Sequence, residues 1–322
     1  MPAGCVIGVD LGGTKLLAGV VDQDLNVHHR AQRRARGADE AEVLQTIVGA
    51  VREVLDASEL PIAGIGFGVP SLVDPVTGTV HSTVHLPLRG VPFRDVMAER
   101  LGLPVWVDND ANVALLAEHR AGAAVGVEDA VMLTLGTGIG GAIVLGGQLR
   151  RGVNGGGGEF GHTIVDPQGV RCDCGNVGCL ETIVSGRALG RAAERAAREA
   201  PDSGLGLALE NGREITGMLC TDLAHDGDRV AQSVVRAMGE QLGWGLVNVV
   251  NALNPSVVVV GGGVVAAGDL LLEPARAIVR RHALVPVGNA EIVPARFGEE
   301  SGMLGAALLA LDGLGGRPEA AA

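Results

Sequence analysis

Two apolar runs near the start of the chain predict a β-hairpin. The runs at 6–9 and 16–20 flank a polar, glycine-rich turn, Asp10-Leu11-Gly12-Gly13-Thr14. Short apolar segments bounded by Gly and Asp are typical of strands joined by a turn. A second hairpin of the same form is predicted over 130–145, with the turn Gly136-Thr137-Gly138. Because each hairpin opens a long stretch of its own, the pattern fits two related domains.

Apolar residues at helical spacing predict an amphipathic helix over 39–57. The same criteria predict further helices at 93–101, 110–121, 186–200, 229–252, 269–282 and 301–311, and strands at 62–69, 104–107 and 256–260. Residues 153–180 follow neither period and are predicted to be irregular. Strands mixed with helices, with glycine-rich turns after strands, predict an α/β fold.

Composition and charge narrow the classes of function. The chain has 322 residues, of which 47% are hydrophobic and 2% aromatic, and its formal net charge is -12. An acidic surface repels a phosphate backbone and few aromatic rings are available for stacking, so no nucleic-acid partner is expected. We also expect no signal peptide and no membrane segment, which predicts a cytoplasmic protein. Its five cysteines then favour a metal site or buried thiols over disulfides.

Three glycine-rich turns could hold phosphate, because glycine lets backbone N–H groups face an anion. They are the two hairpin turns and Gly261-Gly262-Gly263, which follows the predicted strand 256–260. The only lysine, Lys15, follows Thr14, which excludes a Walker A loop. Residues 136–141 match G-x-G-x-x-G, but a strand follows where a dinucleotide site needs a helix. We favour a nucleoside triphosphate held by both hairpin turns, with Mg²⁺ between Asp10 and phosphate; ordinary tight turns are the alternative.

A cluster of cysteines predicts a structural zinc site. Cys172, Cys174 and Cys179 lie close together, with Gly175 and Gly178 between them. Zn²⁺ prefers four sulfur or nitrogen ligands, and His162 is the expected fourth. Such a closed site leaves no position for catalysis. Reduced surface cysteines are the alternative.

Polar residues that suit a sugar surround this segment. Glu159 and Glu181 flank it, and Asn109 and Asp110 lie where a strand meets a helix, which is where α/β folds place ligands. Carboxylates and amides bind neighbouring hydroxyl groups. Asp110 is also a good helix N-cap, and capping is the alternative explanation for it.

In this order, these motifs resemble the ROK family (repressors, open reading frames and kinases) of bacterial sugar kinases, and within it the glucokinases. The resemblance covers nearly the whole chain. The matching segments are Asp10-Leu11-Gly12-Gly13-Thr14-Lys15, Asn109-Asp110-Ala111-Asn112, the run 135–141, Glu159-Phe160-Gly161-His162 and C-x-C-G-x-x-G-C-x-E at 172–181.

The resemblance implies an α/β, actin-like ATPase fold with two RNase H-like domains flanking a ligand cleft. Residues 1–118 would form the N-terminal domain, with helix 301–314 packed back on it. Residues 119–300 would form the C-terminal domain with the zinc loop, and 315–322 a disordered tail. The implied reaction is ATP-dependent phosphorylation of a hexose, with glucose converted to glucose 6-phosphate. A homo-oligomer, dimer or tetramer, is usual for the family.

The resemblance also assigns roles to residues. Asp110 would be the general base and ATP with Mg²⁺ the donor. The sugar would contact Asn109, Asp110, Glu159, His162 and Glu181. The nucleotide would contact Asp10, Gly12, Gly13, Thr14, Lys15, Gly136, Thr137, Gly138, Gly262 and Gly263. His162, Cys172, Cys174 and Cys179 would hold structural Zn²⁺, whose loss should weaken sugar binding far more than nucleotide binding.

Two departures from the glucokinase pattern leave the hexose open. Glucokinases of the family commonly have Pro-Asn-Leu where this chain has Val84-His85-Leu86, and often Pro-Gly where it has Pro70-Ser71. The alternatives are a ROK kinase for N-acetylmannosamine, fructose or mannose, and a non-catalytic, sugar-responsive regulator. Family repressors carry a helix-turn-helix before the first motif, and only nine residues precede Asp10. Polyphosphate as donor, regulation and the roles of Cys5 and Cys220 also stay open.

Overall fold

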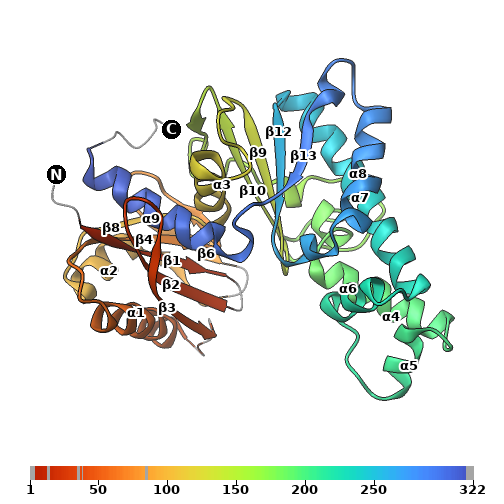
Figure 1. Ribbon diagram of the computed structural model, residues 1–322, viewed down its shortest axis with the longest axis horizontal. Coiled ribbons are helices and arrows are strands. Elements are labelled where there is room, and N and C mark those ends of the chain that lie inside the picture. Colours follow the sequence, from red (N-terminus) through yellow and green to blue (C-terminus); the bar gives the residue numbers. More distant parts are fainter. Residues whose placement is uncertain (1–3, 13–14, 35–36, 38, 84–85, 317–322) are drawn as a thin grey trace. The chain divides into compact units, whose positions relative to one another are not determined.

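The computed structural model describes residues 4–12, 15–34, 37, 39–83 and 86–316. The chain forms two compact units, each with its own hydrophobic core (Figure 1). Unit 1 is drawn from Met1–Gly126, Ala142–Gly158 and Glu299–Ala322, and unit 2 consists of Val127–Gly141 and Glu159–Gly298. Among the predictions, those for Gly13, Thr14, His85 and the tail residues 317–322 lie outside the described residues.

The main sheet of unit 1 has the strand order β3-β2-β1-β4-β8. Its strands are β1 Cys5–Leu11, β2 Lys15–Val21, β3 Val27–Arg34, β4 Ile62–Val69 and β8 Val105–Asn109. β1 and β2 form the predicted antiparallel hairpin, and β4 and β8 run parallel to β1. The sequence prediction missed β3, because this edge strand is mostly polar and exposed and so lacks the apolar pattern of its neighbours.

Helices cover both faces of this sheet. α1 Glu40–Ala57 and α2 Phe93–Leu101 share one core with the apolar side chains of β1, β2 and β4. α3 Asp110–Ala121 and α9 Ser301–Leu314 pack on the other face, and Figure 1 shows α9 (blue) lying across β1 and β4. A Cβ added at Gly8 or Gly66 would lie 2.0 or 1.8 Å from a carbonyl oxygen of α9. Glycine therefore allows α9 to approach these strands closely.

A small antiparallel sheet completes the description of unit 1. It consists of β5 Ser71–Val73, β6 Val80–Thr83 and β7 Arg89–Val91. The first of these strands follows β4 directly, so its backbone comes close to the end of β8. This position matters for the residues at the start of α3.

The second five-stranded sheet has the order β11-β10-β9-β12-β13. Its strands are β9 Ala130–Leu135, β10 Ile139–Leu145, β11 Gln148–Leu149, β12 Val257–Gly261 and β13 Glu291–Pro294. Within unit 2, β12 runs parallel to both β9 and β13, and residues 139–141 begin β10. The predicted hairpin over 130–145 is confirmed, with its turn at 136–138.

Unit 2 also contains five helices. They are α4 Gly186–Glu199, α5 Gly204–Glu210, α6 Gly217–His225, α7 Arg229–Leu253 and α8 Asp269–His282. Buried side chains of β9 and β12 form a core with α4, α6, α7 and α8. The predicted helices at 186–200, 229–252 and 269–282 are confirmed, whereas α5 and α6 were missed because they are short.

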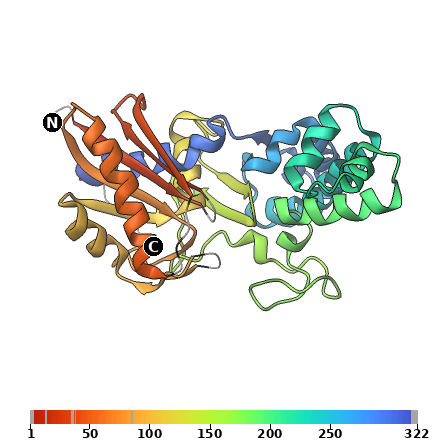
Figure 2. The same cartoon turned by 90° about the horizontal axis from the view of Figure 1, so that it is seen from below.

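Residues 153–180 follow a mostly irregular course, as predicted, with a 3-10 turn at Phe160–His162 and another at the end of the segment, Leu180–Thr182. Figure 2 shows part of this segment as a light-green loop. Among the residues that the structure describes, no helix has the length and apolar character needed to cross a bilayer.

Candidate active site and metal centre

Asp10 and Asp110 lie on either side of a glycine in unit 1. Asp10 is near the end of β1, and Asp110 begins α3 directly after β8. A Cβ added at Gly68 of β4 would lie 3.7 Å from Asp10 Oδ1 and 3.4 Å from the Cα of Asp110. The parallel strands β1, β4 and β8 thus bring two predicted site residues together at their carboxyl ends, where α/β folds place ligands.

The Asp10 carboxyl group is partly buried, against the start of α9. A Cβ at Gly302, in the first turn of that helix, would lie 2.4 Å from Asp10 Cγ. Burial, and then the charge on Asp110, raise the pKa of Asp10 to about 7, while Lys15 acts in the opposite direction. A divalent cation beside Asp10 would offset both effects, because it stabilises the ionised carboxylate.

Asn109 is the N-cap of α3, so capping by Asp110 was the wrong alternative. Asn109 Oδ1 accepts hydrogen bonds from the backbone N–H groups of Ala111 and Asn112, at 2.9 and 3.2 Å. Its amide nitrogen donates to the carbonyl oxygen of Ser71 in β5 at 3.3 Å. Asp110 is the first residue of the helix, where the helix dipole favours its negative charge.

A buried ion pair supports this strand end, and the sequence prediction missed it. Arg151 Nε donates to Asp108 Oδ2 at 2.7 Å, and the two side chains are only 9% and 4% exposed. Asp108 Oδ1 accepts from the backbone N–H of Asn109 at 2.7 Å and from Asn112 Nδ2 at 2.9 Å. The signal available in the sequence was Asp108, a charged residue near the end of a mostly apolar strand. Its partner lies 43 positions away, which no local pattern reveals.

Lys15 forms an ion pair with a carboxylate. Its Nζ lies 2.6 Å from Glu299 Oε2, and the two side chains are 45% and 75% exposed. In the same hairpin, the backbone N–H of Gly12 donates to the carbonyl oxygen of Lys15 at 2.8 Å and so joins the two strands beside the turn. The Lys15 ammonium group is thus already compensated in the described part of the hairpin.

The turn at 136–138, called the glycine turn below, lies beside the third glycine-rich segment, residues 261–263, in unit 2. Because β9 and β12 are parallel neighbours, with Thr134 opposite Gly261, the residues following each strand lie at one edge of the sheet. A Cβ at Gly262 would lie 2.5 Å from the carbonyl oxygen of Leu135, and its φ is +82°. The structure therefore brings Gly136, Thr137 and Gly138 to the same sheet edge as Gly262 and Gly263.

Glu181 contacts the glycine turn and the residue that follows it. Its Oε2 accepts from the backbone N–H of Ile139 at 2.8 Å, and a Cβ at Gly138 would lie 2.1 Å from this oxygen. Arg187 lies 3.7 Å from its other oxygen. Glu181 thus supports the backbone of the glycine turn, a role that the sequence prediction did not include.

The four predicted zinc ligands converge. Their ligand atoms all lie within 4.8 Å of one another, with Cys174 Sγ 3.6 Å from Cys179 Sγ and Cys172 Sγ 3.8 Å from His162 Nδ1. Tetrahedral zinc with Zn–S bonds of about 2.3 Å separates its sulfur ligands by about 3.8 Å. The donor set and its spacing therefore fit Zn²⁺.

The three thiols of this cluster lie close enough together to shift one another's pKa values. Burial, together with hydrogen bonds from Cys174 and Cys172, raises the pKa of Cys179 to about 12. A zinc ion would displace these protons, since it binds thiolates. All five cysteines are free thiols, and Cys5 and Cys220 are buried in the cores of units 1 and 2. Cys5 and Cys220 are therefore buried thiols, one of the two alternatives that the sequence analysis favoured for the cysteines.

His162 lies between the cysteines and Glu159. Its Nδ1 is on the cysteine side, while Nε2 lies 3.9 Å from Glu159 Oε2, too far for a direct hydrogen bond. Partial desolvation raises the pKa of the Glu159 carboxyl group. The electrostatic interaction with His162 acts in the opposite direction and offsets part of this rise. If Nδ1 binds the metal, Nε2 keeps its proton and can donate a hydrogen bond to a ligand beside Glu159.

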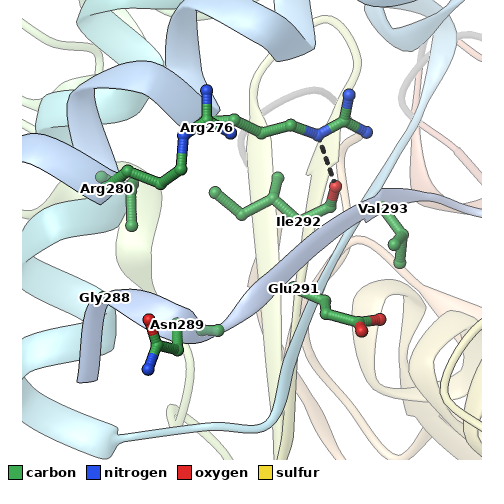
Figure 3. Close-up of a pocket in the computed structure, with 9 residues that line it drawn as sticks. Arg276, Arg280, Gly288, Asn289, Glu291, Ile292 and Val293 are labelled. Carbon is green, nitrogen blue, oxygen red and sulfur yellow. Dashed lines mark hydrogen bonds between the residues drawn. The ribbon is translucent and has the colours of Figure 1, made fainter. Parts of the chain in front are cut away.

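A cavity of about 390 Å³ lies apart from these residues in unit 2, between α8 and β13 (Figure 3). Arg276 and Arg280 line it, but both guanidinium groups lie within 4 Å of Glu273, and Arg276 also donates to the carbonyl oxygen of Ile292. Because these cations are already compensated, the cavity does not favour an anion. It contains none of the predicted site residues.

Comparison with known proteins identifies the family. The ROK family model matches residues 6–313. The chain belongs to the ROK family. The glucokinase of Streptomyces coelicolor is 37% identical over 95% of this chain and 98% of that protein. The glucokinase of Halalkalibacterium halodurans is 36% identical over 93% of this chain and 92% of that protein.

A solved ROK structure has the same fold. The chain superposes on the ROK family glucokinase of Streptomyces griseus, in complex with glucose and AMPPNP, with a TM-score of 0.89 and 37% identity. The match covers 96% of this chain and 100% of that chain. The ROK resemblance and the predicted α/β, actin-like ATPase fold are therefore both confirmed.

Proposed function

We propose that this ROK family protein is an ATP-dependent glucokinase, which transfers the γ-phosphoryl group of ATP to the 6-hydroxyl group of glucose. The products are glucose 6-phosphate and ADP. The observation that carries the proposal is the match over almost the whole chain to a ROK glucokinase in complex with glucose and AMPPNP. Glucokinases among the sequence relatives support it.

Asp110 is the proposed general base. Phosphoryl transfer depends mainly on positioning and charge neutralisation, so the base orients the sugar hydroxyl group as well as removing its proton. The N-terminus of α3 stabilises the Asp110 carboxylate, and the Asn109 cap holds the first turn of the helix. Asn109, Glu159, His162 and Glu181 are the further residues that we propose for the sugar.

The nucleotide is assigned to the glycine-rich turns. The residues proposed for the phosphates are 12–14, 136–138 and 262–263, because glycine-rich turns can direct backbone N–H groups at an anion. Mg²⁺ supplies the charge neutralisation that the phosphates need, and Asp10 is the residue proposed to hold it, directly or through water. Zn²⁺ at the Cys₃His cluster has a structural role, since four protein ligands leave no open position.

A coupled assay of ADP release with a panel of hexoses and Mg·ATP tests this function. Glucose should give the highest kcat/KM among glucose, mannose, fructose and N-acetylmannosamine. A higher kcat/KM for another hexose would identify that hexose as the substrate. Sugar binding without ADP release would indicate a regulator. Replacing ATP by polyphosphate tests the donor. Because the reaction consumes ATP, we propose that the enzyme works in the cytoplasm. Analytical sedimentation of the purified protein tests whether it forms the predicted homo-oligomer.

The requirement for Mg²⁺ should depend on pH through Asp10. With its pKa at about 7, the carboxyl group is protonated and neutral below that pH and anionic above it. The Mg²⁺ concentration for half-maximal rate should therefore rise about tenfold from pH 8 to pH 6, because metal and proton compete for one carboxylate. Asp10→Asn is the matched control. The phosphates of ATP titrate equally in assays of both proteins, so any difference in pH dependence comes from Asp10. An equal pH dependence in this variant would contradict the role of Asp10.

Lys15→Met should lower kcat/KM by less than about tenfold. The ammonium group already pairs with exposed Glu299, and such surface pairs contribute at most about 1 kcal/mol. The substitution therefore removes a surface contact rather than a phosphate ligand. Steady-state kinetics with varied ATP provide the measurement. A loss above about 100-fold would show that Lys15 leaves Glu299 and binds phosphate in the transition state.

A further inference from the structure

The side chain of Arg187 contacts three separate segments of unit 2. Its Nε donates to the carbonyl oxygen of Thr137 at 3.2 Å, in the glycine turn. Its Nη1 donates to Asp173 Oδ2 at 2.8 Å, and Nη2 lies 3.7 Å from Glu181 Oε1. Asp173 stands between the zinc ligands Cys172 and Cys174, in the cysteine loop (residues 172–179).

The backbone around Arg187 holds this side chain in place. Arg187 is in the first turn of α4, which Ser185 caps by accepting from the N–H of Ala188 at 3.2 Å. The preceding N–H, that of Gly186, donates to the carbonyl oxygen of Gly136 at 2.8 Å. The start of α4 is therefore bonded to the glycine turn through both backbone and side chain. The planar guanidinium fork suits several acceptors at fixed angles.

Two connections lead from the cysteine loop to the glycine turn. The first runs from Asp173 through Arg187 to Thr137. In the second, Glu181 follows the ligand Cys179 by two residues and accepts from the N–H of Ile139, directly after the turn. A metal ion that closes the cysteine loop restricts both Asp173 and Glu181, so the metal also restricts the turn.

We propose that Arg187 is a positioning residue that couples the cysteine loop to the glycine turn, so that Zn²⁺ supports nucleotide binding as well as sugar binding. The inference rests on the proposed function, in which the glycine turn binds ATP. It differs from the sequence expectation that zinc loss mainly affects the sugar. That expectation treated the cysteine loop as separate from the hairpin turns, whereas Arg187 contacts both.

Calorimetric titration with Mg·AMPPNP, without sugar, tests the coupling in zinc-loaded and zinc-depleted protein. In the wild type, zinc removal should weaken AMPPNP binding by about tenfold, within the usual range for coupled sites. Arg187→Ala should show part of this loss while zinc-loaded, and zinc removal should then add about threefold rather than tenfold, because the connection through Glu181 remains. Arg187→Lys should recover part of the loss. Arg198→Ala is the matched control, since it removes an arginine further along α4 that pairs only with Glu194 among the contacts described for it.

Zinc affinity provides the reciprocal measurement on the zinc-loaded protein. Linkage requires AMPPNP to strengthen zinc binding by the factor with which zinc strengthens AMPPNP binding. Titration against a competing chelator should show the full gain in the wild type and in Arg198→Ala, and a smaller gain of about threefold in Arg187→Ala, where the connection through Glu181 remains. A gain in Arg187→Ala as large as that of the wild type overturns the inference and leaves the proposed function intact. A wild-type protein that binds no AMPPNP overturns both.

Discussion

Asp110→Asn should lower kcat for glucose phosphorylation by at least about 100-fold, the lower end of the range for loss of a general base. The amide keeps the shape of the side chain but cannot accept the proton of the 6-hydroxyl group. Because Asn109 is the residue that caps α3, the substitution leaves the start of the helix intact. The coupled assay at saturating glucose and Mg·ATP measures kcat directly.

Asp95→Asn is a matched control for this variant. Asp95 is exposed in the first turn of α2, so its substitution also removes a carboxylate from the start of a helix in unit 1. It should leave kcat unchanged, since Asp95 is not among the proposed site residues. A near-normal kcat in Asp110→Asn would show that another group accepts the proton, and it would remove Asp110 from the mechanism.

Arg151→Met should lower the free energy of unfolding of unit 1 by about 3 kcal/mol. Methionine fills much of the same space but leaves the buried Asp108 carboxylate without its cation. The remaining donors to Asp108, which are Asn109 N and Asn112 Nδ2, are neutral and compensate only part of that charge. Because total stabilities are usually about 5–15 kcal/mol, this loss is a large fraction of the whole.

The two tryptophans allow the loss to be assigned to one unit. Trp106 is in β8 of unit 1, two residues before Asp108, and Trp244 is in α7 of unit 2. In a Trp244→Phe background, urea unfolding followed by fluorescence reports on unit 1 alone. Adding Asp108→Asn to Arg151→Met should restore at least about 1 kcal/mol, because the uncompensated charge is then removed. No recovery in this double variant would indicate that Arg151 acts through packing rather than charge.

The sequence alone determined those features that depend on neighbours along the chain. Strand pairing in the first hairpin follows from two apolar runs around a short turn, and both were visible at 6–20. The amphipathic helix at 39–57 begins after its Asp39 cap and follows the expected period. The clustering of the four proposed zinc ligands was also predictable, because three of the four lie within a few residues and glycines let the chain turn between them.

Only the tertiary structure decided which polar groups bond across long stretches of sequence. Arg151 stood in a glycine-rich segment with no visible partner until the fold placed it on Asp108. Glu181 was predicted as a sugar ligand, and the fold shows its carboxylate bonded 42 positions away to Ile139. Local periodicity reports which face of an element is apolar. It contains no information on which buried charges or carbonyl groups meet, because chain topology sets those contacts.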